Sequence, residues 1–393
     1  MTSTSLPSAK LRLSLRAGDI VKSEIRSMSV ECERVGGINL AQGVCDTPVP
    51  SEIASAVAEG VSRGFNSYTR HDGIDQLRRA IADKVVTFNG LAADPETNVV
   101  VSAGSTGALY CTCLALLDPG DGVVLFEPYY GYHLNTLLSV DAKPSFVPMR
   151  APDWTFTIES LESAIGPHTR AIIVNTPGNP SGKVFTRAEL ELIAEVATRH
   201  DLFVFTDEIY EHFLFDGRAH ISPATIPGLA DRTITISGFS KTFSITGWRI
   251  GYAIADERWA KMIGFYNDLV YVCAPSPLQY AVAQGLRAID RPYYEGLSEE
   301  YAGKREQICA TLREIGLPPS VPQGAYYVIA DATRLPGVDS KERAMHLLQR
   351  TGVASVPGEA FFQTEQGASC LRFCFAKSGR DLDEACRRLL TLR

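Results

Sequence analysis

The segment Ser237-Gly238-Phe239-Ser240-Lys241-Thr242-Phe243-Ser244-Ile245-Thr246-Gly247-Trp248-Arg249-Ile250-Gly251 is the most informative part of this chain. It follows a β-branched run at 233–237, so we expect a strand that delivers Lys241 at its carboxyl end. Most lysines are solvated at the protein surface. The apolar, glycine-punctuated neighbours of Lys241 instead predict desolvation. Desolvation lowers the pKa of the amine and leaves it available to attack a carbonyl.

Other short apolar runs, bounded by Gly, Pro or Asp, resemble the run before Lys241. Together with it they predict strands at 98–103, 122–127, 170–175, 202–206, 233–237 and 250–255. Helical patterns separate most of these runs; at 186–200, Thr186 and Glu189 form the sequence signature of a capping box. Alternating strands and helices predict an α/β fold with a mostly parallel central sheet. Because most runs do not alternate in polarity, helices are expected on both faces.

The C-terminal part of the chain has a different pattern. Longer amphipathic stretches at 278–289, 299–315 and 341–349 flank two short strands at 325–330 and 370–375. These predict a second, smaller α+β domain. The length of 393 residues agrees with two domains, since single cores rarely exceed roughly 300 residues.

Composition excludes several classes of protein. The chain carries 38 basic and 45 acidic residues, a net charge of −7, and no basic block that would indicate a nucleic-acid partner. Its apolar runs are far shorter than the roughly 18 residues of a membrane span. The nine cysteines show no metal-binding spacing, which predicts reduced thiols in a cytoplasmic protein and no metal. Residues 1–16 faintly resemble a transit peptide, but an N-terminal arm is the favoured interpretation.

Polar residues follow several of the predicted strands, where open parallel sheets bind their ligands. The loop that starts at Gly104 could hold a phosphate on a helix N-terminus, or could simply be a turn with a Ser or Thr cap. Asn179 lies in a turn-rich loop after the strand at 170–175. Asp207 and Tyr210 follow the strand at 202–206, where Asp207 could alternatively cap the next helix.

The lysine segment is similar to the cofactor-attachment signature of class I/II aminotransferases, the fold type I enzymes that use pyridoxal 5′-phosphate. The stretches 39–43, 176–182, 207–210 and 371–373 also match the family, in the family's order. The resemblance therefore covers nearly the whole chain. It implies a transfer of the amino group from an L-amino acid to a 2-oxo acid, by a ping-pong mechanism.

The resemblance implies roles for the matching residues. Lys241 is expected to hold the cofactor as a Schiff base and then to move a proton between substrate and cofactor. Asp207 is expected beside the pyridine nitrogen, where its charge keeps the ring protonated. Tyr210 and Asn179 are expected to hydrogen-bond the phenolic oxygen of the cofactor, and Tyr130 to stack on its ring.

The same resemblance assigns an anion-binding role to a second group. Arg249 and Ser240 are expected to bind the cofactor phosphate, together with Gly104, Ser105 and Thr106. Arginine suits this role because its planar fork matches phosphate oxygens.

A third group is expected at the substrate and at a subunit interface. Arg372, in an apolar strand that offers no anion, is expected to hold the substrate carboxylate, with Gly43 and Asn179 beside it. Tyr68 resembles the tyrosine that reaches the phosphate of a neighbouring subunit, which implies a homodimer. The large domain is expected at 48–285, and the small domain at 1–47 with 286–393.

The substrate is less constrained. No arginine occurs between Arg258 and Arg287, where dicarboxylate-specific relatives supply one. Nearby aromatic residues favour an aromatic or apolar donor; they are Tyr266, Tyr271, Phe239, Tyr129 and Phe362. Val44-Cys45-Asp46 and Gly238 depart from the commoner family pattern.

Two other functions stay open on the sequence. A cysteine-conjugate β-lyase could use the same lysine and Asp207 to expel a β-substituent. A non-catalytic regulatory domain could bind the cofactor, but only about 40 residues precede the first motif and none forms a basic recognition helix.

Overall fold

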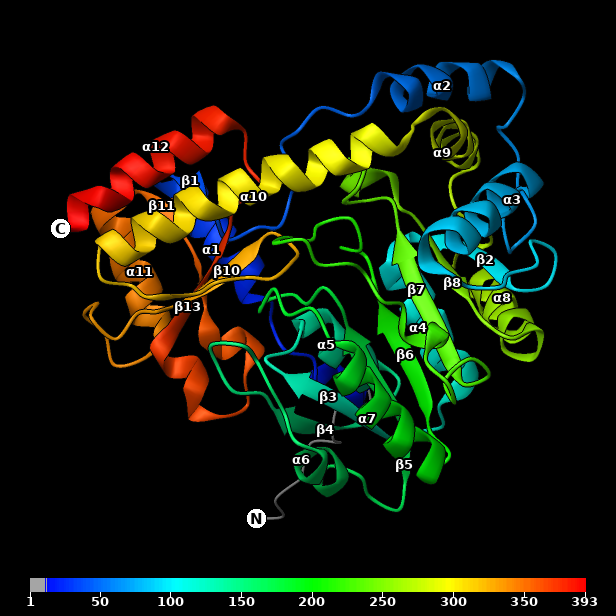
Figure 1. Ribbon diagram of the computed structural model, residues 1–393, viewed down its shortest axis with the longest axis horizontal. Coiled ribbons are helices and arrows are strands. Elements are labelled where there is room, and N and C mark those ends of the chain that lie inside the picture. The colour runs from blue at the N-terminus through cyan, green and yellow to red at the C-terminus, as the bar shows by residue number, and fades with distance from the viewer. Residues whose placement is uncertain (1–10, 12) are drawn as a thin grey trace, which may run out of the picture.

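The computed structural model describes residue 11 and residues 13–393 of the chain. Figure 1 shows a large sheet with helices around it, beside a smaller group of strands and helices. The predicted α/β fold with a mostly parallel sheet is confirmed. Most of the predicted N-terminal arm, residues 1–10 and 12, lies outside the described part.

The central sheet contains seven strands in the order β2-β8-β7-β6-β5-β3-β4. Their bounds are β2 (Val99–Ala103), β3 (Gly122–Glu127), β4 (Lys143–Pro148), β5 (Thr169–Asn175), β6 (Phe203–Asp207), β7 (Thr233–Gly238) and β8 (Ile250–Ile254). Only β8 runs antiparallel to its neighbours. All six strands predicted for this part are present. Each end of each strand lies within one residue of its predicted position. The sequence missed β4, an edge strand with prolines at its second and last positions, Pro144 and Pro148.

Helices cover both faces of this sheet. They are α2 (Ser51–Ser62), α3 (Asp75–Lys84), α4 (Gly104–Leu116), α5 (Gly131–Ser139), α6 (Ile158–Ser163), α7 (Arg187–Arg199), α8 (Glu257–Tyr271) and α9 (Ser276–Ala288). α4, α5 and α8 pack on one face and enclose a core of their own. The predicted capping box of α7 is confirmed: Thr186 N donates to Glu189 Oε2 at 2.8 Å, and Glu189 N donates to Thr186 Oγ1 at 3.2 Å.

The smaller part is built from both ends of the chain. A four-stranded antiparallel sheet has the order β12 (Val356–Pro357), β13 (Cys370–Cys374), β10 (Tyr327–Asp331) and β9 (Pro319–Ser320), and β1 (Ile38–Asn39) pairs with β11 (Val353–Ala354). Its helices are α1 (Glu24–Arg34), α10 (Arg291–Glu314), α11 (Ser340–Thr351) and α12 (Gly379–Leu389). The predicted strands and helices are present here too, although α10 begins earlier than predicted because Pro292 fits the first turn of a helix.

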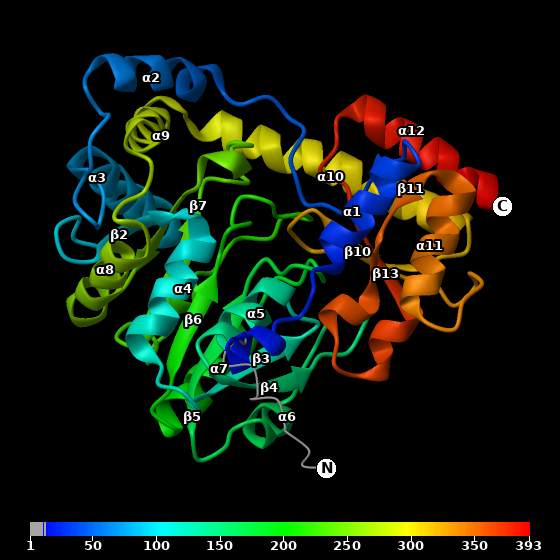
Figure 2. The same cartoon turned by 180° about the vertical axis from the view of Figure 1, so that it is seen from behind.

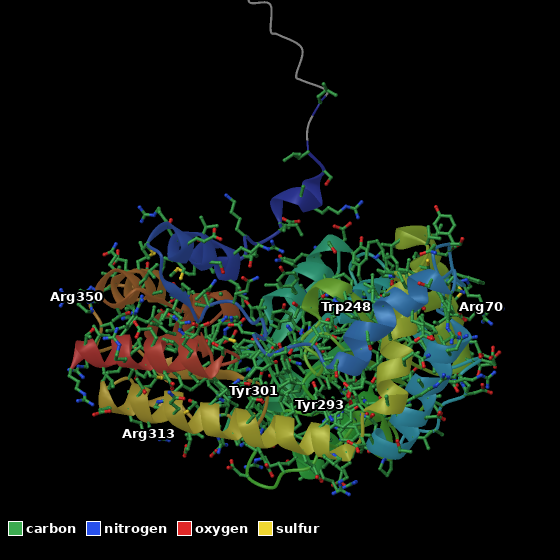
Figure 3. All side chains as sticks on the ribbon, turned by 90° about the horizontal axis from the view of Figure 1, so that it is seen from above. Arg70, Trp248, Tyr293, Tyr301, Arg313 and Arg350 are labelled. Carbon is green, nitrogen blue, oxygen red and sulfur yellow. The ribbon has the colours of Figure 1, made fainter. Side chains whose placement is uncertain are left out.

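Helix α10 connects the two parts. Figure 3 shows it running along the molecule beside α12, with Tyr293 and Tyr301 on its inner side. Tyr293 Oη donates to the carbonyl oxygen of Thr242 at 2.6 Å, and Tyr301 is fully buried. The helix is therefore anchored directly to the loop that carries Lys241.

The N-terminal segment makes a second connection. Figure 2 shows α1 beside β11, and the segment before it near α5. Val21 and Asn135 exchange two hydrogen bonds of 2.9 Å, which attach this segment to α5. Lys341 on α11 pairs with Glu24 and Ser27 on α1. The segment thus bridges the large sheet and the smaller part.

Two features of the structure relate to the composition: the length and apolarity of its helices, and the state of its cysteines. No helix in the described residues has both the length and the apolarity needed to cross a bilayer. All nine cysteines are free thiols, and eight of them are buried. Their apolar surroundings agree with the expectation from sequence.

Candidate active site

The strand ends bring the predicted site residues to one edge of the central sheet. Gly104 follows β2, Asn179 follows β5, and Asp207 ends β6. Lys241 follows β7, and Arg249 immediately precedes β8. Tyr130 caps α5 after β3, and Arg372 comes from β13 of the smaller part. Since neighbouring parallel strands end at the same edge, residues far apart in sequence become neighbours.

Lys241 lies in the environment that the sequence predicts. Its Nζ donates to the carbonyl oxygen of Gly43 at 3.0 Å and lies 6.0 and 5.9 Å from the ring centres of Tyr210 and Tyr326. Burial lowers the pKa of Lys241 below its usual range. A neutral amine is therefore accessible at a lower pH than for a surface lysine.

Asp207 pairs with a histidine that sequence reasoning missed. His133 Nε2 lies 2.8 Å from Asp207 Oδ2, and both side chains are buried. Asp207 Oδ1 also accepts from the backbone N–H of Ile209 at 3.3 Å. A turn rather than a helix follows β6, so Asp207 does not cap a helix. The sequence did contain one signal for His133. It comes three residues after Tyr130, and this spacing puts both residues on nearly the same side of α5.

An anion-binding loop forms where β2 meets α4. Gly104 has φ +75°, and a Cβ at this position would lie 2.3 Å from Arg249 Nη2. The N-cap residue of α4, Ala103, offers no side-chain cap, so the alternative of a Ser or Thr cap is wrong. Arg249 donates to the carbonyl oxygens of Thr246 and Ala103 and pairs with no acidic residue in the described chain. Free N–H groups beside an unpaired guanidinium are suited to a phosphate.

Arg372 is a second cation without a carboxylate. It is 1% exposed, donates to Asn179 Oδ1 at 2.9 Å and to the carbonyl oxygen of Ala41, and leaves its Nε without a partner. Its guanidinium lies 4.4 Å from the ring centre of Tyr327 and 4.9 Å from that of Phe361. No acidic side chain among the described residues neutralises it. A buried charge of this kind calls for an anionic ligand.

Two tyrosines of β10 and its preceding turn complete the site, and the sequence identified neither. Tyr210 Oη lies 3.0 Å from Tyr327 Oη. Tyr326 Oη donates to the carbonyl oxygen of Gly43 at 3.4 Å. A Cβ on Gly43 would lie 1.8 Å from Tyr327 Oη, so any side chain here would displace the phenol. The sequence indicated a buried strand here but not which site its rings would reach.

The aromatic residues that favoured an aromatic donor lie elsewhere. Phe239 packs on Phe243 and Tyr252 in the core, and Phe362 packs on Trp154. Tyr129 is buried in the core beneath α4 and α5. Phe239, Phe362 and Tyr129 thus pack in the core rather than against Lys241, and the preference for an aromatic or apolar donor stays a prediction. The rings around Lys241 and Arg372 are those of Tyr210, Tyr326, Tyr327 and Phe361.

Tyr68 is the one predicted site residue that the chain does not bring to the others. It lies between α2 and α3 and is 84% exposed. Its phenol contacts none of the site residues described above.

Comparison with known proteins agrees with this geometry. Residues 35–389 match the family described as aminotransferase class I and II. The chain belongs to this family. A probable N-succinyldiaminopimelate aminotransferase of Mycobacterium tuberculosis is 37% identical over 93% of this chain and 94% of its own length. An aromatic-amino-acid aminotransferase of Thermococcus litoralis is 34% identical over 96% and 97%. The solved structure of the M. tuberculosis N-succinyldiaminopimelate aminotransferase superimposes with a TM-score of 0.93, at 34% identity over 97% of this chain and 100% of that one.

This aminotransferase uses pyridoxal 5′-phosphate, and its residues fit that cofactor. Ser105, Thr106, Tyr130, His133 and Asp207 line one cavity, so the anion-binding loop and the Asp207 carboxylate face the same space. The cofactor carries a phosphate and a basic pyridine nitrogen. An uncapped helix N-terminus and a carboxylate are the groups that these two ends require.

A buried polar network follows Asp207 in the aminotransferase. Glu208, Glu211 and His220 place ligand atoms within 4.8 Å of one another, a spacing that could hold a metal. However, Lys84 Nζ already lies 2.5 Å from Glu211 Oε1, and His220 Nε2 lies 2.6 Å from Glu208 Oε2. Burial acts to raise the pKa of Glu211, but the charge of Lys84 and other neighbours outweighs it and lowers the pKa to about 2. Glu211 is therefore neutralised by the chain's own cation, Lys84.

Proposed function

We propose that Lys241 binds the cofactor covalently and that the surrounding residues carry out a ping-pong transfer between an L-amino acid and a 2-oxo acid. The observation that carries this proposal is that a lysine of lowered pKa shares one site with two arginines, Arg249 and Arg372, that have no acidic partner in the described chain. When bound, pyridoxal phosphate supplies a carbonyl that takes up the amino group and a ring that accepts electrons from the substrate.

In this proposal Lys241 is the base. With the cofactor and an amino acid bound, its free amine would take the proton from the substrate Cα and hold it for return. The lowered pKa of Lys241 supports this role, because a base must be unprotonated at working pH. The carbonyl oxygen of Gly43, 3.0 Å from Nζ, can hold the freed amine in position.

Asp207 keeps the pyridine nitrogen protonated, and Tyr210 with Asn179 binds the phenolic oxygen. An ionised carboxylate favours the protonated ring by its charge. His133 holds that carboxylate in place. The ring of Tyr130 contacts that of His133 edge-on, with 5.3 Å between the ring centres. In this position Tyr130 can stack on the cofactor ring.

The phosphate binds at the N-terminus of α4. Gly104, Ser105 and Thr106 present it with N–H groups, and Arg249 and Ser240 complete the site. Arg372 binds the carboxylate of the substrate, which lies beside Gly43 and Asn179.

We propose an aromatic or apolar amino donor. Four aromatic rings surround Lys241 and Arg372. No arginine occurs between Arg258 and Arg287, where dicarboxylate-specific relatives supply one. The name of the T. litoralis relative agrees with this preference, whereas that of the M. tuberculosis relative names a substrate with a further carboxylate. A kcat/KM for aspartate far above those for phenylalanine, tyrosine and methionine would contradict the preference.

We also propose a homodimer in which Tyr68 reaches the phosphate site of the partner subunit. Tyr68 is exposed, and α8 beside it carries exposed apolar residues, with Leu269 at 79%. His71 packs on Phe265 at 5.6 Å, so the two surfaces are continuous. An exposed apolar face of this kind is typical of a surface that a partner subunit covers.

Two further predictions remain part of this proposal. One is the domain division, with a large domain at 48–285 and a small domain at 1–47 with 286–393. The other is a cytoplasmic location. The free thiols of all nine cysteines support a reducing compartment.

The decisive experiment is the visible absorbance spectrum of the purified protein before and after adding single L-amino acids without a keto acid. We expect a band from the cofactor joined to Lys241 that bleaches with particular amino acids and recovers with a 2-oxo acid. The Lys241→Ala variant should lack this band. A band that persists while pyruvate and ammonia are released would instead indicate a β-lyase, and no band after reconstitution would contradict the role of Lys241.

A further inference from the structure

Tyr327 contacts two residues with different proposed tasks. Its hydroxyl oxygen lies 3.0 Å from that of Tyr210, and its ring centre lies 4.4 Å from the guanidinium carbon of Arg372. The rings of Tyr327 and Tyr210 are nearly perpendicular, at 88°. All three side chains are buried. Tyr327 therefore lies between the proposed site of the cofactor's phenolic oxygen and the proposed site of the substrate carboxylate.

The sheet explains this position. In the β10–β13 pairing, Ile329 faces Arg372 and Tyr327 faces Cys374, so Tyr327 is the diagonal neighbour of Arg372 on the same face. Gly43 packs against the hydroxyl from the other direction, since a Cβ there would lie 1.8 Å from Tyr327 Oη. The phenol has little freedom to move away from Tyr210.

The protons of the two phenols determine the direction of their hydrogen bond. Burial raises the pKa of Tyr210 and of Tyr327 well above the usual range, so each hydroxyl keeps its single proton. Tyr210 can donate to the cofactor only if it does not donate to Tyr327. Tyr327 must then be the donor to Tyr210, and a donor that also accepts a hydrogen bond is polarised and strengthened.

We propose that Tyr327 is a positioning residue whose hydroxyl directs the proton of Tyr210 toward the cofactor's phenolic oxygen, while its ring holds Arg372 in place for the substrate carboxylate. This inference rests on the proposed role of Tyr210. The phenolic oxygen gains negative charge when the nitrogen joined to Lys241 loses its proton, because the internal N–H···O hydrogen bond is then lost. A stronger Tyr210 donor therefore favours the deprotonated form.

The test is a spectrophotometric pH titration of the cofactor-loaded protein. Tyr327→Phe removes only the hydroxyl, and we expect the midpoint of the absorbance change to rise by about 0.3 pH unit or more, as a 10–30% weaker charged hydrogen bond implies. The matched control is Tyr301→Phe, which removes an equally buried phenol on α10 whose hydroxyl has no hydrogen-bond partner among the described residues. It should leave the midpoint within 0.1 unit or so of the wild type.

A second variant reaches the same hydroxyl without changing residue 327. Gly43→Ala places a methyl group against Tyr327 Oη and should also raise the midpoint.

The role of the Tyr327 ring needs a separate test. Binding of phenylpropionate, an inert carboxylate, is measured by the spectral change that it causes. Tyr327→Phe should retain the affinity, and Tyr327→Leu should weaken it about fivefold through loss of the cation–π contact.

The outcomes separate this inference from the proposed function. A wild-type protein without a visible band would contradict the role of Lys241 itself. A wild-type band whose midpoint is unchanged in both Tyr327→Phe and Gly43→Ala, or a shift no larger than that of Tyr301→Phe, would overturn the role of the Tyr327 hydroxyl alone. An unchanged affinity in Tyr327→Leu would overturn the role of its ring.

Discussion

His133 Nε2 lies 2.8 Å from Oδ2 of Asp207, with both side chains buried at the edge of the central sheet. The contact joins α5 to the end of β6. It also positions Tyr130, whose ring meets the imidazole edge-on. The carboxylate proposed to hold the pyridine nitrogen is thus oriented by a residue on another element, a common arrangement around reactive groups.

The His133→Phe variant should therefore impair chemistry more than binding. We expect kcat to fall about tenfold, as the loss of a hydrogen bond to a charged group implies, with KM changed little. Steady-state kinetics with the best donor measures both. His346→Phe, on α11 in the smaller part, is the matched control, and equal kinetics for the two variants would contradict the role of His133.

Replacement of Arg372 by lysine should weaken substrate binding. Lysine keeps the positive charge but loses the planar fork and the contacts with Tyr327 and Phe361. We expect KM for the amino donor to rise roughly 10- to 100-fold. Arg305→Lys is a suitable comparison, because Arg305 is also buried but pairs with Asp216 outside the site. A KM that stays at the wild-type value in Arg372→Lys would show that another group binds the carboxylate.

A charge on the exposed face of α8 should separate the proposed dimer. We expect Leu269→Asp to shift the protein from dimer to monomer in light scattering and to weaken cofactor retention, because Tyr68 of the partner subunit would be lost. Val338→Asp introduces the same charge at a residue that is equally exposed, at 83%, in the smaller part. If the wild type is itself monomeric with its cofactor firmly bound, the assignment of Tyr68 to a second subunit is wrong.

Stability in acid should depend on His212. Burial between Phe88 and Tyr294 lowers the pKa of His212 from 6.5 to about 3. Between these pH values the unfolded chain holds a proton on this histidine and the folded protein does not, so the free energy of unfolding falls as the pH falls. The contribution is at most about 1.4 kcal/mol per pH unit.

The His212→Phe variant tests this sign. Phenylalanine preserves the stacking but cannot titrate, so its urea unfolding free energy should decline less steeply between pH 6.5 and 4 than that of the wild type. His168→Gln, an exposed histidine, should follow the wild-type curve. Parallel curves for His212→Phe and the wild type would mean that His212 does not carry the acid sensitivity.

The strands were predictable because their physics is local. A strand covered on both faces is a continuous apolar run, and this pattern located β5 and β6 within one residue of their bounds. β4 lacks that pattern, since it lies at the sheet edge and contains Pro144. The positions of Asp207 and Lys241 were equally predictable, because parallel strands present their carboxyl ends together.

Contacts between separate elements were not predictable in this way. His133 reaches Asp207 because α5 packs across the sheet with a particular rotation, which a single sequence does not reveal. Tyr327 reaches Tyr210 through packing of the smaller part against the large sheet. Conversely, Phe239 and Tyr129 looked suited to a binding pocket, but both follow the end of a strand and pack in the core.

The antiparallel pairing of β7 with β8 also affects how firmly the proposed cofactor is retained. Gly238 faces Gly251 across the two strands, so Lys241 and Arg249 belong to one closed loop. In the proposed mechanism, Arg249 of the same loop would still hold the phosphate whenever the covalent bond to Lys241 opens. The cofactor then stays next to the lysine at a high effective concentration, as in a two-point chelate. The cofactor can dissociate only when the bond to Lys241 and the phosphate contacts are both broken at once. Each attachment re-forms quickly while the other persists.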